Sequence, residues 1–395
     1  MFPKLMKSPL NPSTQFSAQR SSRLIYPSRR RFLMASAAAL SGVMLSNCRQ
    51  NLSSVDSSDS AESSANNASG SSDTLHVYTW SGYTDDEMIN AFTEKTGIDV
   101  VVDLYDSNET MLARMQAGGG DAYSVIYPSE YMVQEMIELN MLTEIDHDRL
   151  SNYGDIFFDQ WQDPAYDPGN AHSIPFSWGT TGLLYNKAQL SDPVQDWQYL
   201  WEHQDELSNR MTLLDDMRET IGAVLKSLGY SINSTDPEAL EEAYQRLRDL
   251  TPAIANFQSF GFEDQILGGD LLMVMSYSSD AIPVTLENED LDYIVPESGA
   301  SLWTDTIVIP KTAPNVDAAY EWINFLLDSE VAKTSVENLY FATPIKPAYD
   351  QLSDELKQNE DLFPPESVLA QCEGLAPVDD ATELYERYWT QLTSA

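Results

Sequence analysis

The fold class follows from residues 75–105, which read LHVYTWSGYTDDEMINAFTEKTGIDVVVDLY. Residues 75–80 and 98–105 are rich in β-branched and aromatic side chains, which predicts two strands. Between them, residues 85–96 predict a helix that ends at Gly97. A strand, a helix and a second strand in this order favour a right-handed crossover between parallel strands.

The same alternation continues along the rest of the chain, without an internal repeat. The part after residue 73 has about 320 residues, which is enough for two lobes of ordinary domain size. We therefore predict an α/β fold with mostly parallel sheets flanked by helices. Further helices are expected over residues 108–117, 217–228, 235–250 and 316–327, and further strands over residues 123–129, 211–216, 271–277, 291–296 and 306–310.

The first 47 residues have the composition of an export signal. Seven basic and no acidic residues precede Cys48, and the arginines at 29–31 stand before an apolar run over residues 34–45. This run is too short to span a bilayer. The segment resembles a twin-arginine signal, and LSNC at residues 45–48 resembles a lipobox, although Asn47 is uncommon before the cysteine. We expect lipid attachment at Cys48; a basic arm with a chance cysteine is the alternative.

Residues 48–73 are dominated by serine and carry almost nothing to bury. Such a segment stays disordered and behaves as a flexible tether. We expect it to hold the folded body near a membrane that the protein contacts only through the lipid anchor.

Acidic residues greatly outnumber basic ones, with 62 Asp and Glu against 22 Lys and Arg and a net charge of −40. Without the seven basic residues before Cys48, 15 basic residues remain against 62 acidic ones, a net charge of −47. This charge repels nucleic acid and attracts cations. An acidic surface for solubility or for high salt would give the same balance, so the charge alone identifies no ligand.

Motifs of common enzyme and metal sites are absent from the sequence. It has no Walker loop, no dinucleotide-binding glycine pattern, no Gly-x-Ser-x-Gly and no Cys-x-x-Cys, and its four histidines share no metal-ligand spacing. We expect no enzyme activity, no cofactor and no metal site. A hydrolase that uses Asp216 and Asp305 as its two carboxylates is the distant alternative.

Aromatic, hydroxyl and carboxylate side chains recur together where predicted strands end. In α/β sheets, ligands bind outside the carboxyl ends of the strands. Aromatic faces attract cations by about 0.5–2 kcal/mol each, and carboxylates form charge-assisted hydrogen bonds with ammonium groups. The combination favours a long organic cation. It occurs at residues 80–83, 129–131, 215–219, 277–280 and 303–305.

From about residue 75 to its end, the chain resembles the spermidine/putrescine-binding proteins of bacterial polyamine ABC uptake systems. The segments that carry the resemblance are YTWSGY (78–83), LYDSNETMLARM (104–115), YPSEYMV (127–133), SIPFSWGTTGLLYN (173–186), LLDDMRETIGAVLKSLGYS (213–231), LWTDTIVIP (302–310) and INFLLDSEVAK (323–333).

This resemblance implies a two-lobed periplasmic-binding-protein fold that closes on its ligand. One lobe would comprise residues 74–180 plus 304–349, and the other residues 181–303 plus 350–395. It further implies polyamine binding in the periplasm and delivery to an inner-membrane ABC permease, and we expect a monomer. A binding protein for ferric iron is the nearer alternative, although iron binders usually use paired tyrosines.

The resemblance also implies a set of ligand-binding residues, each with a structural alternative. Asp216 and Glu219 fit a helix capping box, and Trp80 and Trp303 could be core residues. The implied ligand-binding residues are Trp80, Ser81, Tyr83, Ser129, Tyr131, Asp216, Glu219, Tyr277, Asp280, Trp303, Asp305 and Phe341.

Three positions depart from the family pattern. Gly82 stands where the family usually has an acid, and Leu375 aligns with a glutamine that contacts the ligand. Asp280 stands where members of the putrescine type tend to have an aspartate. The choice between spermidine and putrescine therefore stays open, and we expect both to bind, with spermidine modestly preferred.

Overall fold

The computed structural model describes residues 74–394 of the 395-residue chain. The expected export signal, Cys48 and the tether lie outside the described residues. None of the helices formed by residues 74–394 has the length and apolar character needed to cross a membrane.

The strands are short except for one. Their bounds are β1 Thr74–Trp80, β2 Asp99–Tyr105, β3 Val125–Ile126, β4 Ser173–Asn186, β5 Met211–Leu213, β6 Ile254–Phe257, β7 Met273–Tyr277, β8 Leu291–Ile294 and β9 Leu302–Val308.

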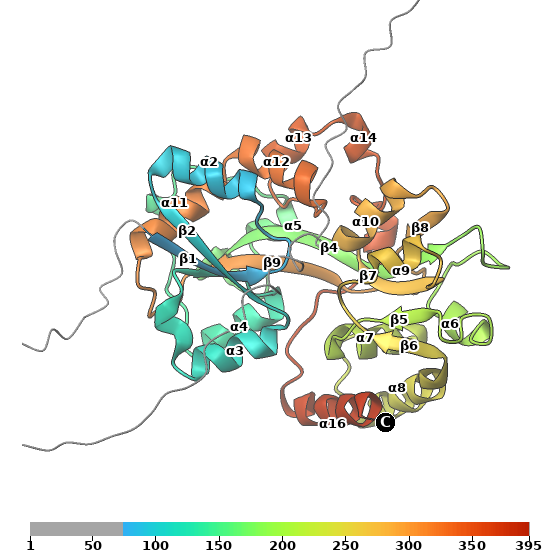
Figure 1. Ribbon diagram of the computed structural model, residues 1–395. Helices are drawn as coiled ribbons and strands as arrows, with labels where there is room; N and C mark the ends of the chain where they lie inside the picture. Colours follow the sequence, from blue (N-terminus) through green and yellow to red (C-terminus); the bar gives the residue numbers. More distant parts are fainter. Residues whose placement is uncertain (1–73, 395) are drawn as a thin grey trace, which may run out of the picture. The chain divides into compact units, whose positions relative to one another are not determined.

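Helices follow most of these strands, and α11 to α16 all come after the last strand, β9 (Figure 1). The longer helices are α2 Asp86–Thr96, α3 Asn108–Gln116, α4 Glu130–Glu138, α7 Met217–Ser227, α8 Pro237–Leu250, α10 Ser278–Glu287, α11 Val316–Leu326, α12 Ser329–Leu339 and α16 Thr382–Thr393. The shorter helices are α5 Asp159–Gln162, α6 Tyr199–Glu202, α9 Glu263–Leu267, α13 Lys346–Gln351, α14 Asp354–Lys357 and α15 Glu366–Leu369.

Local signals explain the first crossover. The Asp85 side chain accepts a hydrogen bond from the Met88 N–H and caps α2, and Gly97 ends the helix with φ of 75°, a value that suits glycine. Strand β2 then pairs parallel to β1 over the full length of both strands, from Thr74 opposite Asp99 to Trp80 opposite Tyr105. The strand, helix and strand expected over residues 75–105 are confirmed.

All strands of residues 74–394 belong to one sheet with the order β2-β1-β3-β9-β4-β7-β5-β6, and β8 pairs with β4. The group β2-β1-β3 and the group β7-β5-β6 are each parallel. In contrast, β4 and β9 run antiparallel to each other, and each is antiparallel to its other neighbours. The α/β prediction is confirmed, with the added finding that antiparallel strands join the two parallel groups.

Strand β4 is the element that links both groups. Its 14 residues are all buried, and it pairs with β9 along its first part and with β7 and β8 along its second. Because both faces of this strand are covered, its sequence does not alternate between apolar and polar residues. Its polar residues Ser173, Ser177, Thr180, Thr181 and Asn186 are buried like the apolar ones. The β4–β9 pair therefore runs through the middle of the sheet (Figure 1).

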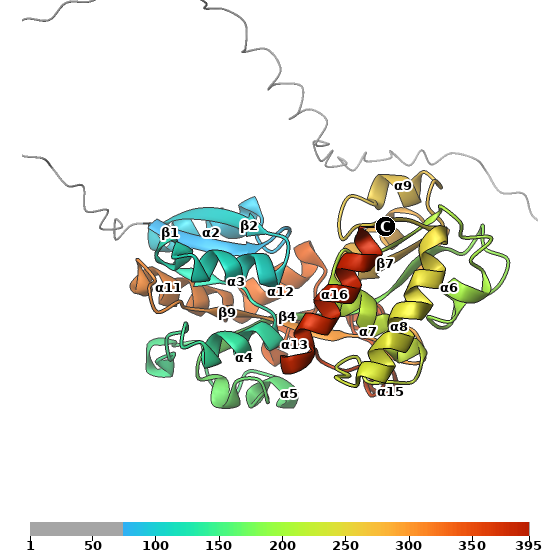
Figure 2. The ribbon, with the colours of Figure 1, turned by 90° about the horizontal axis from the view of Figure 1, so that it is seen from below.

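Two main groups of buried side chains pack on the two parts of this sheet. One is built around β1, β9 and α11 and includes Phe92, Trp322 and Ile307. The other lies around β5, α7 and α8 and includes Leu225 and Leu240. Helices α7, α8 and α16 pack against one another at the second group (Figure 2). Each parallel strand group thus has a core of its own.

Candidate functional site

Asp305 of β9 is the centre of the first half of the site. Its side chain is only 5% exposed. The Ser129 hydroxyl donates a hydrogen bond to Oδ1 over 2.6 Å, and the Tyr83 hydroxyl donates one to Oδ2. Burial raises the pKa of Asp305 to about 6, while these two donors act in the opposite direction. The carboxylate is thus buried, ionisable and held in place by hydroxyl groups.

The sheet brings these three residues together. Tyr83 follows the carboxyl end of β1, and Ser129 follows that of the neighbouring parallel strand β3. Ser129 also forms an antiparallel bridge with Asp305. The Trp80 indole donates to the Tyr127 carbonyl over 2.8 Å, which ties the end of β1 to the end of β3. Tyr83 and Ser129 thus follow strand ends, as expected, whereas Asp305 lies inside β9, which begins at Leu302 and not at residue 306 as the sequence suggested.

A second layer of hydrogen bonds supports Ser129 and Tyr131. The Asn108 amide nitrogen lies 3.1 Å from both the Ser129 hydroxyl and the Tyr131 hydroxyl. The Tyr131 hydroxyl in turn donates to Glu109 over 3.0 Å. We did not identify Asn108 and Glu109 from the sequence. Their position at the start of α3, directly after the carboxyl end of β2, is a signal that could have found them.

Aromatic rings border the Asp305 carboxylate. The ring of Tyr83 lies 5.3 Å from that of Phe341, and the rings of Tyr277 and Trp303 meet edge to face at 6.1 Å. Trp303 is 5% exposed, and its indole N–H has no hydrogen-bond partner within residues 74–394. Trp303 packs closely over Gly179 of β4: a Cβ there would lie 2.3 Å from the indole.

The second half of the site contains Asp216 and Glu219. Asp216 caps α7 by accepting hydrogen bonds from the N–H groups of Arg218 and Glu219. The predicted cap by Asp216 is therefore present, whereas no return hydrogen bond from the Glu219 side chain completes a capping box. Glu219 is 4% exposed, and its Oε2 has no hydrogen-bond partner in the described part of the chain. Burial, followed by the charge of Asp216, raises the pKa of Glu219 to about 8.

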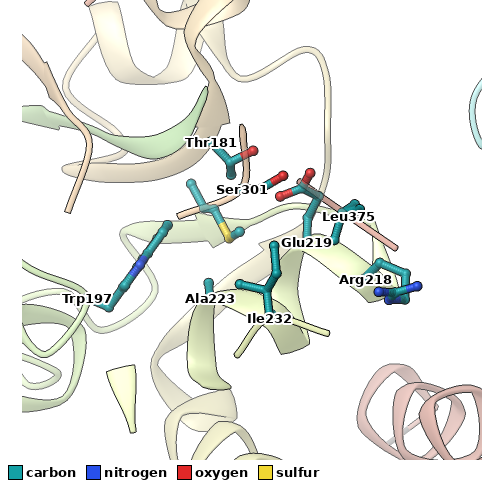
Figure 3. Close-up of a pocket in the computed structure, with 10 residues that line it drawn as sticks. Thr181, Trp197, Arg218, Glu219, Ala223, Ile232, Ser301 and Leu375 are labelled. Atoms are coloured by element: carbon teal, nitrogen blue, oxygen red, sulfur yellow. The ribbon is translucent and has the colours of Figure 1, made fainter. Parts of the chain in front are cut away.

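Glu219 lies against hydroxyl groups of two other elements. Figure 3 shows the oxygen atoms of Thr181 and Ser301 turned toward its carboxylate, in a pocket that Leu375 also lines. The space in this pocket is too small for a water molecule. Both hydroxyls act to lower the pKa of Glu219, although neither forms a hydrogen bond of normal geometry within residues 74–394. The Glu219 carboxylate is therefore buried with only weak hydroxyl partners.

Tyr277 lies between the two halves. Burial raises the pKa of its hydroxyl well above the usual value, and the charges of Asp216, Glu219 and Asp305 add to this rise. All three carboxylates are therefore within electrostatic range of one hydroxyl. A ligand with positive charges at both ends fits this arrangement, because each half supplies at least one buried carboxylate.

Asp280 and Ser81 occupy the edge of the site. Asp280 is partly exposed at the start of α10; burial, together with the charge of Glu263, raises its pKa to about 7. Its charge also acts on Tyr83. Ser81 is exposed beside Gly82, which has φ of 87°. The structure therefore groups most of the expected residues and leaves Ser81 at the surface.

A larger cavity of about 660 Å³ is lined in part by Tyr131. It is bordered by acidic side chains, among them Glu109, Asp379 and Glu386, and by the Arg218 guanidinium. Arg218 is itself buried, lies 5.6 Å from the Tyr131 ring and donates to the Ala376 carbonyl over 2.9 Å. The surroundings of the site are thus acidic, with this cation close to Asp216 and Glu219.

Known proteins resemble this chain over most of its length. The spermidine/putrescine-binding periplasmic protein of Escherichia coli is 34% identical over 81% of this chain and 91% of its own. The putrescine/cadaverine-binding protein of Pseudomonas aeruginosa is 30% identical over 80% of this chain and 93% of its own.

Solved structures also resemble this chain over most of its length. A putative spermidine/putrescine ABC transporter protein from Listeria monocytogenes matches with a TM-score of 0.76 and 34% identity, covering 81% of this chain and 98% of its own. A lipoprotein of Treponema pallidum matches with a TM-score of 0.74 and 27% identity, covering 82% of this chain and 100% of its own. In addition, the family model for bacterial extracellular solute-binding proteins matches residues 87–364. The chain therefore belongs to the family of bacterial extracellular solute-binding proteins.

Proposed function

We propose that this protein binds a polyamine, spermidine or putrescine, outside the cytoplasm and delivers it to an ABC-type uptake permease. The observation that carries the proposal is the arrangement of buried carboxylates at both ends of an aromatic site. Asp305 belongs to one half and Glu219 to the other, both act electrostatically on the Tyr277 hydroxyl, and the Tyr277 ring meets Trp303 edge to face. The relatives named above are spermidine/putrescine-binding and putrescine/cadaverine-binding proteins, which supports the same ligand class.

The chemistry of each group suits an alkyl diamine or triamine. Buried carboxylates require a counter-charge, and an ammonium group supplies it together with hydrogen-bond donors. The faces of Trp303 and Tyr277 can pack on methylene groups and attract the adjacent charges. Ferric iron fits less well, because the pKa values of the hydroxyls of Tyr83, Tyr131 and Tyr277 are well above the usual value, which opposes their ionisation.

The ligand is held between two lobes, residues 74–180 plus 304–349 and residues 181–303 plus 350–395. Tyr83 and Ser129 belong to the first lobe, whereas Asp216, Glu219 and Tyr277 belong to the second, so one ligand contacts both. Binding then pulls the lobes together by hinge motion in β4 and β9. Small-angle scattering of residues 74–395 should show a smaller radius of gyration with saturating spermidine than without ligand.

The protein is exported through the twin-arginine pathway and is retained at the membrane by a lipid on Cys48. The composition of residues 1–73 supports this proposal, and we expect a monomer with no further membrane contact. Mass spectrometry of the membrane fraction tests it: the mature chain should begin at Cys48 and carry added acyl mass, and Cys48→Ala should release the protein into the soluble fraction.

A thermal-shift comparison tests the ligand class. Spermidine, putrescine, spermine and ferric citrate are added separately to the folded body. Spermidine and putrescine should raise the melting temperature, since a ligand that binds only the native state stabilises it. A rise with ferric citrate alone would favour an iron-binding protein, and the absence of any polyamine effect would refute the proposed ligand.

A further inference from the structure

Glu130 connects three segments at the back of the ligand site. It is the first residue of α4, between Ser129 and Tyr131, and is 5% exposed. Its Oε2 accepts the backbone N–H of Thr304 over 2.8 Å, and its Oε1 accepts that of Leu375 over 3.0 Å. One buried carboxylate thus joins α4, β9 and the segment over residues 373–376.

The contact with β9 replaces part of a backbone ladder. The Thr306 N–H donates to the Pro128 carbonyl over 3.0 Å, and the chain then turns into α4. The next N–H on that side of β9 belongs to Thr304, which lies between Trp303 and Asp305. Because α4 leads the backbone away, the Glu130 side chain supplies the acceptor that the ladder would otherwise provide.

The contact with Leu375 fixes the third segment in the same place. The Leu302 N–H donates to the Glu373 carbonyl over 2.9 Å, so this segment already runs beside the start of β9. A Cβ on Gly374 would lie 3.4 Å from Oε1 of Glu130, which shows how closely the backbone approaches the carboxylate. Leu375 also lines the pocket that contains Glu219. Glu130 therefore positions the backbone of β9 in the half with Asp305 and the backbone at Leu375 in the half with Glu219.

We propose that Glu130 is a positioning residue of the ligand site, which holds residues 303–305 against Ser129 and Tyr131 and whose charge is coupled to the cation bound at Asp305. The inference rests on the proposed polyamine function. Glu130 does not contact the ligand itself. It keeps Trp303 and Asp305 of β9 in position.

The charges around Glu130 come from each segment packed against it. Asp305 faces it from β9, and Tyr166, whose buried hydroxyl has no partner among residues 74–394, faces it from the loop before β4. On the third segment, Arg218 binds the Ala376 carbonyl and Lys226 pairs with Glu373 over 2.9 Å. Burial raises the pKa of Glu130 to about 8; Asp305 adds to the rise, and the Thr304 and Leu375 N–H groups oppose it.

Ligand binding should therefore change the protonation of Glu130. In the free protein at neutral pH, a carboxyl with this pKa is mostly protonated. An ammonium group at Asp305 offsets the negative charge there and favours the ionised form of Glu130. Spermidine binding should then release a proton from this residue.

Calorimetric titration with spermidine at pH 7.5, in two buffers of different ionisation enthalpy, tests the inference. Glu130→Gln removes the charge and leaves one of the two N–H groups without an acceptor. We expect about a tenfold loss of affinity and a decrease of roughly half a proton in the number released. Glu138→Gln, an exposed site on the same helix, is the matched control and should keep both values.

Wild-type affinity and wild-type proton release in Glu130→Gln would overturn the inference and leave the polyamine function standing. No binding by the wild-type protein would overturn both. If Glu130→Gln fails to fold, NMR of the wild-type protein provides the test. The amide signals of Thr304 and Leu375 should shift together with a midpoint near pH 8, and this midpoint should be lower when spermidine is bound. Amide signals that ignore pH over this range would also overturn it.

Discussion

Replacement of Asp305 by Asn is the substitution with the largest expected effect on binding. The carboxylate is 5% exposed and accepts hydrogen bonds from Ser129 and Tyr83. With a pKa of about 6, it is mostly ionised at pH 7.5 in the free protein. Asn keeps the size but removes the charge, so a bound ammonium group would lose its counter-charge in a buried place.

The expected loss follows from that burial. Truncating one partner of a buried, hydrogen-bonded charge pair costs about 2–5 kcal/mol, which is at least about a 30-fold loss of affinity. The loss should be similar in relative terms for spermidine and putrescine. The stability of the free protein should increase or stay the same in Asp305→Asn, because the raised pKa of Asp305 shows that the fold disfavours its ionised form.

Isothermal titration calorimetry and thermal melting of the same samples measure both effects. Asp99→Asn, which removes one charge from the exposed edge strand β2, is the matched control and should bind like the wild-type protein. Equal polyamine affinities for Asp305→Asn and Asp99→Asn would refute the assignment of Asp305 to the site. A large fall in melting temperature for Asp305→Asn would refute the electrostatic reasoning.

Three further predictions concern pH, packing and selectivity. The pKa of Glu219 is raised to about 8, so spermidine affinity measured by calorimetry should rise between pH 6 and pH 8.5. The free energy of unfolding of the free protein should decrease over the same range, because a carboxyl group with a higher pKa in the folded than in the unfolded state loses its stabilising effect as it ionises. Flat profiles of affinity and stability against pH would contradict this prediction. Gly179→Ala should displace the Trp303 indole, change tryptophan fluorescence and weaken binding at least about tenfold, whereas an unchanged spectrum would disprove the close packing. Because Gly82 has φ of 87°, Gly82→Glu should lower the stability by about 1 kcal/mol. Ser81→Asp is the better way to restore the acid that position 82 lacks, and this variant should bind spermidine at least about fivefold more tightly. Unchanged spermidine affinity would show that the ligand does not reach this end.

Local signals in the sequence predicted the helices well and some strands less well: the strand expected over residues 123–129 is only β3 Val125–Ile126, and the strand expected over residues 306–310 is β9 Leu302–Val308. The helix over residues 85–96 is observed as α2 Asp86–Thr96, with Asp85 as its cap and Gly97 at its end. The helix over residues 217–228 is observed as Met217–Ser227, capped by Asp216. Such boundaries depend on side chains next to each other in the chain, and this is why they can be read from sequence.

The sheet topology was less accessible. The long strand β4 is buried on both faces, so its sequence has no alternation that would give its direction or its partners. The antiparallel pairing of β4 with β9 joins residues more than 100 positions apart. The prediction of mostly parallel sheets therefore holds within each strand group and not where the groups meet.

The same distinction applies to the site. Residues proposed to contact the ligand, such as Trp303 and Asp305, stand out through their chemistry and through resemblance to the family. Asn108 and Glu130 act through other residues over 21 and 174 positions of sequence, and only the structure shows those contacts. Similarly, the unsuitability of Gly82 for a larger residue depends on its φ, which the sequence does not reveal.

We propose that this chain binds a polyamine at the site around Asp305. Calorimetric titration of the wild-type protein with spermidine at pH 8 is the decisive experiment for this proposal. We expect saturable binding of one spermidine per chain, with putrescine competing for the same site. The absence of binding heat for both polyamines, together with a melting temperature that neither of them changes, would contradict the claim.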